Sequence, residues 1–328
     1  MSSALFPATC FGKLPGFADF VRFNAAGRET IAFDQWIQQG LFHTRTVLGT
    51  QWEVAFENAP GYQFVFLPEN AGRLLVGILS PSQDRSNRKY PFLVSLLVDR
   101  PRFGDTNVQL APFAFTDFFV RAGRLVTRAK SGSGMPELAE QTEELGVASA
   151  DAISDEFTKH TQYLEQTDWR SFLLSALGTF DEGKRYLLFA NLAESVLPLR
   201  RHSAARFALG LRFPVSSSST LAGHEVSFWV QVALSLSGAG TVVPIMFWPW
   251  TTDEKPGHVL LFFRQPSPKV FLQLVKPDLA SDGICVLDRE GDGSIERTRG
   301  ILDRAFRTVL DDPDQKLSDF LARLSKLF

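Results

Sequence analysis

The chain has 328 residues, and 45% of them are hydrophobic, which is enough for a large core in one extended domain or two modest ones. Its 34 basic and 36 acidic residues give a formal net charge of -2. A charge so close to zero provides no overall attraction to nucleic acid or to an anionic membrane, so we expect neither as a partner.

The cysteine pattern and the N-terminal residues indicate the cellular compartment in which the protein works. Cys10 and Cys285 lie far apart and form neither a C-x-x-C motif nor a disulfide framework, which favours a reducing environment. The N-terminal residues lack the basic start and apolar run of a secretory signal. No apolar run approaches the roughly 20 residues that span a bilayer. We therefore expect a cytoplasmic protein without membrane insertion.

The first hundred residues predict a helix followed by strands. Residues 30–41 have the spacing of an amphipathic helix, with Thr30 as its N-cap. The apolar face of this helix consists of Phe33, Trp36, Ile37 and Leu41. Four strand-like runs follow: WEVAFE, GYQFVFL, RLLVGILS and YPFLVSLLVD. Short turns between them favour antiparallel neighbours. The last two are almost wholly apolar, so both should be central and covered on both faces.

The middle of the chain predicts helices and then a second set of strands. Residues 112–178 look helical, interrupted by a flexible Ser-Gly-Ser-Gly segment at 131–134. The strand-like runs after them are RYLLFANL, RFALGLRFP, EVSFWVQVALSLS, TVVPIMFW and GHVLLFFR. Four consecutive serines at 216–219 predict a loop or a mobile segment.

The C-terminal residues predict a closing helix. Asp312, Pro313 and Gln315 have the spacing of an N-cap, a first helical residue and a capping-box partner. The apolar stripe that follows consists of Leu317, Phe320, Leu321, Leu324 and Phe328. We expect this stripe to pack on the protein's own core, with a groove on a partner as the alternative.

Together these elements predict a mixed α/β fold of the α+β kind, with a largely antiparallel sheet or sheets flanked by helices. We divide the chain into an N-terminal region, residues 1–130, and a second region, residues 131–328. Whether the two regions form one continuous domain, and whether they share one sheet, is left open by the pattern.

Motifs for familiar chemistry are incomplete. Lys13 lacks the upstream glycine and the following Ser or Thr of a P-loop. Neither G-x-G-x-x-G nor G-x-S-x-G occurs where a dinucleotide fold or a serine hydrolase needs it. Residues 288–293 begin like an EF-hand, but Arg299 stands where a bidentate carboxylate is required, so we expect a turn. The five histidines occur singly, away from zinc-ligand spacing. No catalytic, metal or cofactor residues are therefore assigned.

Two features suggest surfaces for a partner. Arg121, Arg124 and Arg128 share a helical face, which is either a solvated face or a site for an acidic or phosphorylated partner. The chain also has 30 Phe against 4 Tyr, which indicates a Phe-rich core or an exposed docking patch.

The stretch SPSQDRSNRKYP, residues 80–91, is a polar loop between two apolar runs. Asp84 and Arg85 have the chemistry of a catalytic carboxylate and an anion clamp, but neighbouring side chains cooperate only in a turn. No histidine or cysteine lies nearby in sequence as a base or nucleophile. We therefore favour a turn in which the Asp and Arg side chains bind the backbone.

Five segments resemble, in order, those of the TagF family, also called ImpM, of the type VI secretion system. They are FGKLPGFADFVR (11–22), FDQWIQQGL (33–41), GILSPSQDRSNRKYPFLVSL (77–96), VPIMFWPW (243–250) and LLFFRQPSPKVFLQLV (260–275). Two positions depart from the family pattern: Ala18 and Asn87 stand where a glycine is usual. If both positions need a positive φ, asparagine fits better than alanine.

The resemblance implies a non-enzymatic cytoplasmic accessory protein without a cofactor. Such proteins repress type VI secretion after translation, in some systems by binding the forkhead-associated scaffold Fha. The alternatives are a hydrolase-like enzyme, which needs the two signature segments to converge in one cleft, and a structural subunit of the apparatus. The hydrolase would use Lys13, Asp19, Ser82, Asp84 and Arg85.

The candidate signature and interaction residues are Lys13, Asp19, Trp36, Ser82, Asp84, Arg85, Arg88, Trp248 and Trp250. For each of the three tryptophans, packing in the core is the competing interpretation.

Overall fold

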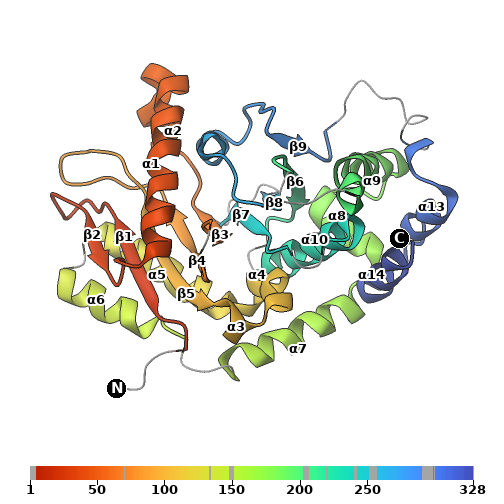
Figure 1. The fold of residues 1–328 in the computed structure, drawn as a ribbon, viewed down its shortest axis with the longest axis horizontal. Helices are drawn as coiled ribbons and strands as arrows, with labels where there is room; N and C mark the ends of the chain where they lie inside the picture. Colours follow the sequence, from red (N-terminus) through yellow and green to blue (C-terminus); the bar gives the residue numbers. More distant parts are fainter. Residues whose placement is uncertain are drawn as a thin grey trace.

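The computed structural model describes residues 5–69, 71–132, 134–147, 151–201, 207–218, 221–239, 242–250, 257–289, 298 and 300–327. Within them, nine strands form one sheet in the order β2-β1-β5-β4-β3-β7-β8-β6-β9 (Figure 1). The strands are β1 (Ala8–Gly12), β2 (Val21–Phe23), β3 (Tyr62–Phe66), β4 (Arg73–Ser80), β5 (Phe92–Asp99), β6 (Gly210–Val215), β7 (Ile245–Pro249), β8 (Gly257–Phe262) and β9 (Ile284–Val286).

The sheet joins the two regions of the chain. Every strand pair is antiparallel except β6 with β9, which is parallel. The join is the pair β3–β7, in which Phe64 lies opposite Phe247. The predicted α+β class is confirmed, and both regions contribute strands to one shared sheet.

Helices cover both faces of the sheet. The described α-helices are α1 (Arg28–Leu48), α2 (Trp52–Glu57), α3 (Arg100–Phe103), α4 (Ala111–Ala114), α5 (Thr116–Ser131), α6 (Met135–Glu144), α7 (Asp151–Gln166), α8 (Trp169–Leu177), α9 (Glu182–Val196), α10 (Ala222–Ser237), α11 (Phe271–Val275), α13 (Arg304–Leu310) and α14 (Leu317–Ser325). The helix predicted over 30–41 and the helices predicted over 112–178 are confirmed.

Alternate residues of the strands enter two different cores. Phe64 and Phe66 of β3 face the core under α1, whereas Val65 enters the larger core on the opposite face. The two apolar runs predicted to be central are β4 and β5, and both are buried along nearly their whole length. Their continuous apolar sequence follows from this double coverage.

Helix α1 starts earlier than its sequence pattern suggested. The residue at its N-cap is Gly27, and Thr30 is buried inside the first turn, so the prediction of Thr30 as the cap was wrong. Glu29 holds this end of the helix through a bidentate ion pair with Arg73 of β4, at 2.8 and 3.2 Å.

Three predicted strands are helices. WEVAFE is α2, RYLLFANL belongs to α9, and EVSFWVQVALSLS lies within α10. In α2 the buried residues are Trp52 and Phe56, four apart, whereas Val54 is exposed. The α10 run is apolar on nearly all sides because the helix is buried on nearly all sides. A short, wholly buried run has no clear period, so sequence alone did not separate strand from helix.

Strands β1 and β2 were missed because both are short, at five and three residues. The predicted cap at Asp312 is also wrong: α14 begins at Leu317 after Lys316. Gln315 instead donates through Nε2 to the carbonyls of Val309 and Asp312, the latter at 3.0 Å. The predictions that involve Ser133, Ser219, residues 290–297, Arg299 and Phe328 lie outside the described residues, wholly or in part.

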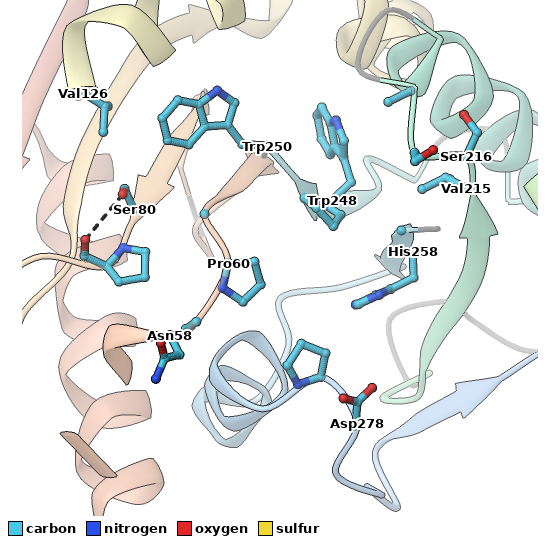
Figure 2. A pocket seen from close by; sticks show the side chains of 18 of the residues that line it. Asn58, Pro60, Ser80, Val126, Val215, Ser216, Trp248, Trp250, His258 and Asp278 are labelled. Atoms are coloured by element: carbon cyan, nitrogen blue, oxygen red, sulfur yellow. Dashed lines mark hydrogen bonds between the residues drawn. The ribbon is translucent and has the colours of Figure 1, made fainter. Parts of the chain in front are cut away.

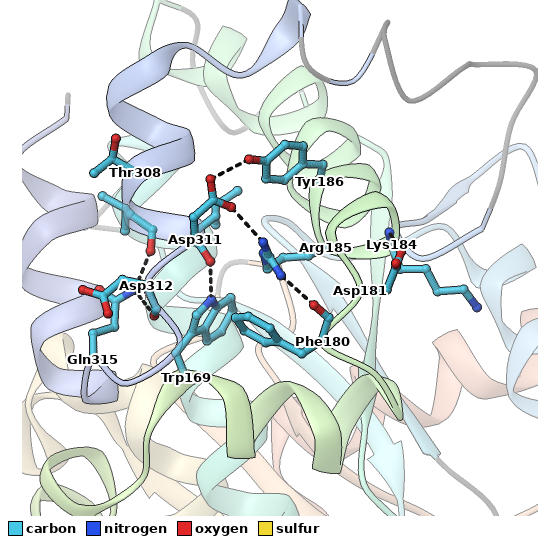
Figure 3. A network of polar contacts seen from close by, with 12 residues as sticks. Trp169, Phe180, Asp181, Lys184, Arg185, Tyr186, Thr308, Asp311, Asp312 and Gln315 are labelled. Carbon is cyan, nitrogen blue, oxygen red and sulfur yellow. Dashed lines mark hydrogen bonds and ion pairs between the residues drawn. The ribbon is translucent and has the colours of Figure 1, made fainter.

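The closing helices pack on the protein's own core, as predicted for the apolar stripe. Leu317, Phe320 and Leu324 are fully buried, and the Phe320 ring stacks on Trp169 at 4.2 Å. Figure 3 shows the polar contacts at this junction: Asp311 accepts from Arg185 and Tyr186, each at 2.7 Å. None of the described helices is long and apolar enough to cross a membrane.

Candidate interaction surface

The two signature segments converge in space. Gly12, the last residue of β1, pairs with Phe92 at the start of β5, so the loop after β1 lies beside the loop before β5. Gly12 has φ 133°, and a Cβ at this position would lie 2.1 Å from the carbonyl oxygen of Pro91. A glycine is therefore required where the two loops meet. We call the two loops, residues 12–20 and 80–91, the signature surface.

Asp84 is the centre of this surface. Its buried carboxylate accepts from Lys13 Nζ at 2.9 Å and from Arg88 Nε at 2.7 Å on Oδ2. Its Oδ1 accepts from the backbone N–H groups of Ser86 and Arg88, at 2.9 and 3.0 Å. The carboxylate thus binds both loops and stabilises the turn around itself.

These contacts decide the protonation state of Asp84. Burial by itself would raise the pKa of the carboxyl group, but the hydrogen bonds from Lys13, Arg88 and Ser86 outweigh it and hold the pKa well below its usual range. An ionised carboxylate with both oxygens occupied by strong donors is a poor proton acceptor. The convergence that the hydrolase interpretation needed is present, yet Asp84 lacks the chemistry of a general base.

The two arginines bind across the same junction. Arg85 donates from Nη2 to the carbonyl of Gly16 at 2.7 Å, and its backbone N–H donates to the carbonyl of Phe17 at 2.8 Å. Arg88 donates from Nη2 to the carbonyl of Ala18 at 2.6 Å. Both side chains are still exposed, and the Arg88 side chain keeps 59% of its surface in solvent. The loops therefore present fixed guanidinium groups to the outside.

The two departures from the family pattern behave differently. Asn87 has φ 60°, in the left-handed region that asparagine tolerates better than most residues. Ala18 is not among the described residues with positive φ, so its turn does not need glycine. The local geometry thus accepts both substitutions without a strained alanine.

The remaining candidates are more scattered. Asp19 is exposed, and among the described residues its side chain accepts only a local bond from the backbone N–H of Phe20, at 2.7 Å. Ser82 is buried, and its Oγ makes no hydrogen bond to another described residue. Trp36 and Trp248 are buried in the core, and Trp36 donates from Nε1 to the carbonyl of Pro266 at 2.8 Å. A partner has no access to these two rings.

Trp248 and Trp250 both line a cleft, but of the three candidate tryptophans only Trp250 is partly exposed. The cleft has a volume of about 750 Å³ and lies beside the signature surface (Figure 2). Ionisable residues from several segments also line the cleft: Glu57, Lys130, Arg212, His258 and Asp278. Sequence reasoning missed them because no local motif unites them. Lys130 donates to the carbonyl of Pro81 at 2.9 Å and so attaches α5 to the signature surface.

The charge state of the cleft follows from its burial. Burial, and after it the nearby Arg212 guanidinium, lowers the pKa of His258 to about 3, so this imidazole is neutral near pH 7. Burial also lowers the pKa of Lys130.

The arginine stripe predicted on α5 is exposed only in part: Arg124 and Arg128 are exposed, whereas Arg121 pairs with Asp117 at 2.7 Å.

An aromatic cluster adjoins the signature surface on the side of α1. Phe11 and Phe20 stack with their centroids 5.4 Å apart, and Tyr90 meets Phe20 edge-on at 4.9 Å. The Arg22 guanidinium lies over both phenylalanine rings, at 5.0 and 5.8 Å. Arginine and aromatic side chains are the types enriched at the centres of protein interfaces.

Comparison with known proteins finds a match to a family model in the first part of the chain. Residues 9–145 match the model of the TagF N-terminal domain, described as type VI secretion system-associated. No curated protein sequence matches. Among solved structures, the chain is similar to PA0076 from Pseudomonas aeruginosa PAO1, with 14% identity, 84% of this chain and 96% of that chain covered, and a TM-score of 0.48. The range matched by the family model contains the whole signature surface.

Proposed function

We propose, from the premise that residues 9–145 are a TagF N-terminal domain associated with type VI secretion, that this protein is a non-enzymatic regulator of that system. It represses secretion after translation by binding a secretion component in the cytoplasm. The proposed component is the forkhead-associated scaffold Fha. The signature surface contacts the partner, with Arg85 and Arg88 as the exposed anchors.

The observation that carries this proposal is the way in which the signature surface is built. Its acidic group, Asp84, is buried and fully used inside the protein, while its guanidinium groups are fixed and exposed. Arginines held in place lose little side-chain entropy on binding, and they suit carboxylate or phosphate groups on a partner. This arrangement favours recognition over catalysis.

A binding measurement with purified scaffold tests the proposal. The wild-type chain should bind, and Arg85→Ala should weaken binding by about tenfold or more, as expected for an interface anchor. Arg304→Ala is the matched control, because Arg304 is an exposed arginine at the start of α13, far along the chain. Urea denaturation of each variant checks that folding is unchanged.

A secretion assay tests the repressor role. Deleting the gene should raise the amount of type VI substrate in the culture medium without changing transcript levels, and the Arg85→Ala variant should restore repression less well than wild type. The absence of scaffold binding would refute the proposed partner. Stable stoichiometric recovery with the assembled apparatus would instead favour a structural subunit.

A further inference from the structure

The C-terminal end of α1 and the helix α2 that follows it carry apolar side chains that no other described part of the chain covers. Seven large apolar side chains are exposed among the described residues, and three of them lie here: Phe42 and Val47 in the last turns of α1, and Val54 in α2. Phe42 is the most exposed of the seven, at 76%. In Figure 1 this end of α1, together with α2, projects beyond the sheet. Such a concentration of exposed apolar groups is typical of an interaction surface.

Phe42 borders a groove of about 500 Å³, which we call the Phe42 groove. It lies between α1 and the last residues of the signature surface. Its described lining residues are Gln38, Leu41, Phe42, Arg45, Thr46, Trp52, Lys89 and Tyr90. One wall is therefore a single helical face of α1, with positions 38, 41, 42 and 45 spaced by three or four residues.

The walls of the Phe42 groove are held in place. The Arg45 guanidinium lies over the Trp52 ring, with Cζ 5.7 Å from the ring centroid. Tyr90 packs edge-on against Phe11 and Phe20, and its hydroxyl donates to Asp34. A groove with fixed walls loses little conformational entropy when a ligand enters, which favours binding.

The charge of the groove indicates the chemistry of its occupant. Among the described lining residues there are two cations, Arg45 and Lys89, and no carboxylate. Glu57 forms an ion pair with Lys89, whereas Asp34 accepts from the neutral Tyr90 hydroxyl and keeps its negative charge. Arg45 is therefore the cation of the groove without an ionic partner among the described residues. An uncompensated guanidinium beside an exposed phenylalanine complements an acidic segment that also carries an apolar side chain.

We propose that the Phe42 groove binds an acidic linear segment of the secretion partner. One apolar side chain of that segment packs against Phe42 and Leu41, and its carboxylates lie beside Arg45. This inference rests on the proposed function for the identity of the partner, and it adds a second contact region to the arginines of the signature surface. The chemistry of the segment follows from the groove itself.

Site-specific photocrosslinking in the native cells tests the chemistry of the occupant. A benzophenone amino acid replaces Phe42, and in the matched control it replaces Val120, an exposed apolar residue on α5. Mass spectrometry then maps the crosslinked peptide. A segment with net negative charge and an apolar residue at the crosslink is expected. A neutral or basic segment, a second copy of this chain, or no product above the Val120 control would overturn the proposal.

A binding series separates this inference from the proposed function. Against purified forkhead-associated scaffold, Phe42→Ala and Arg45→Ala should each weaken binding by about 10- to 100-fold, while Val120→Ala should not. Both changes remove exposed side chains, and urea denaturation verifies the fold. Scaffold binding that is indifferent to Phe42→Ala overturns the groove as a contact of that partner. Crosslinking from position 42 to an acidic segment of a different protein would refute the scaffold and leave the groove chemistry supported.

Discussion

At the scale of single residues, Asp84 has the carboxylate that a catalytic base would need, but its hydrogen bonds give it a structural role. Lys13 and Arg88 meet it from two different loops, and two backbone N–H groups complete its four hydrogen bonds. The group is ionised in the folded protein, and its charge is neutralised locally. Breaking such a buried cluster by removing one charge leaves the others without compensation.

The substitution Asp84→Asn should therefore lower the free energy of unfolding by about 3–5 kcal/mol, because Lys13 is left buried without its carboxylate. Urea denaturation monitored by tryptophan fluorescence gives the value. Asp117→Asn is the control, since it removes an exposed partner of Arg121 and should cost less than about 1 kcal/mol. Equal losses in the two variants would contradict the structural role of Asp84.

The same cluster predicts a dependence on acid. The folded-state pKa of Asp84 is lowered, so its contribution to stability is fully present above the unfolded-state pKa of about 4 and is lost as pH falls below it. Between about pH 5 and 2, the free energy of unfolding should therefore fall more steeply in the wild type than in Asp84→Asn. Parallel curves for the two proteins would count against the lowered pKa.

At the scale of elements, α7 and α10 meet through a histidine pair. His160 and His224 lie with their Nδ1 atoms 3.0 Å apart, stacked beside Phe113 of α4. Gln231 Nε2 lies 3.1 Å from His160 Nε2. Because the amide nitrogen donates, His160 Nε2 accepts, and its Nδ1–H then donates to His224. Both imidazoles must be neutral for this chain of bonds to persist.

This contact should make the packing of α7 on α10 sensitive to pH. Burial, and after it the charge of His224, lowers the pKa of His160 to about 3, so its contribution to stability is present above about pH 6.5 and is lost as pH falls. Between about pH 7 and 5 the wild type should lose about 1–2 kcal/mol more than His160→Gln. Urea denaturation at the two pH values measures this difference. An equal loss in both proteins would contradict it.

At the scale of the whole molecule, distant segments complete one another. The sheet passes from the first region of the chain to the second at the β3–β7 pair. The last helices are part of the larger core, and Trp169 of α8 donates from Nε1 to the carbonyl of Leu310 at 2.9 Å. Residues beyond 300 thus stabilise helices that precede them by more than a hundred positions.

Leu324→Ala should accordingly lower the free energy of unfolding by about 2–5 kcal/mol, because the leucine is fully buried in that core. Leu174→Ala offers a control of the same chemistry on α8, where the side chain is half exposed and the change should stay within about 0.5 kcal/mol. Thermal or urea unfolding followed by circular dichroism measures both. Near-neutral behaviour of Leu324→Ala would mean that α14 is dispensable for the core.

Local sequence was sufficient to predict an element where a single hydrophobic period or a single motif dominates the segment. The amphipathic spacing of residues 30–41 predicted α1, and the long apolar runs at β4 and β5 predicted central strands. The turn chemistry of residues 80–91 predicted that Asp84 and the arginines would bind the backbone, because short polar side chains in a turn have backbone groups within reach. The order of the motifs was enough to suggest the family.

The tertiary structure decided what depends on burial from all sides and on partners distant in sequence. The buried runs in α9 and α10 were mistaken for strands, since an element covered on every face shows neither a period of two nor one of 3.6. Lys13 and Asp84 are 71 positions apart, and only the β1–β5 pairing brings them together. The orientation of α1 on the sheet also could not be predicted locally. It buries Trp36 on the side that meets the sheet and leaves Phe42 exposed beside Tyr90.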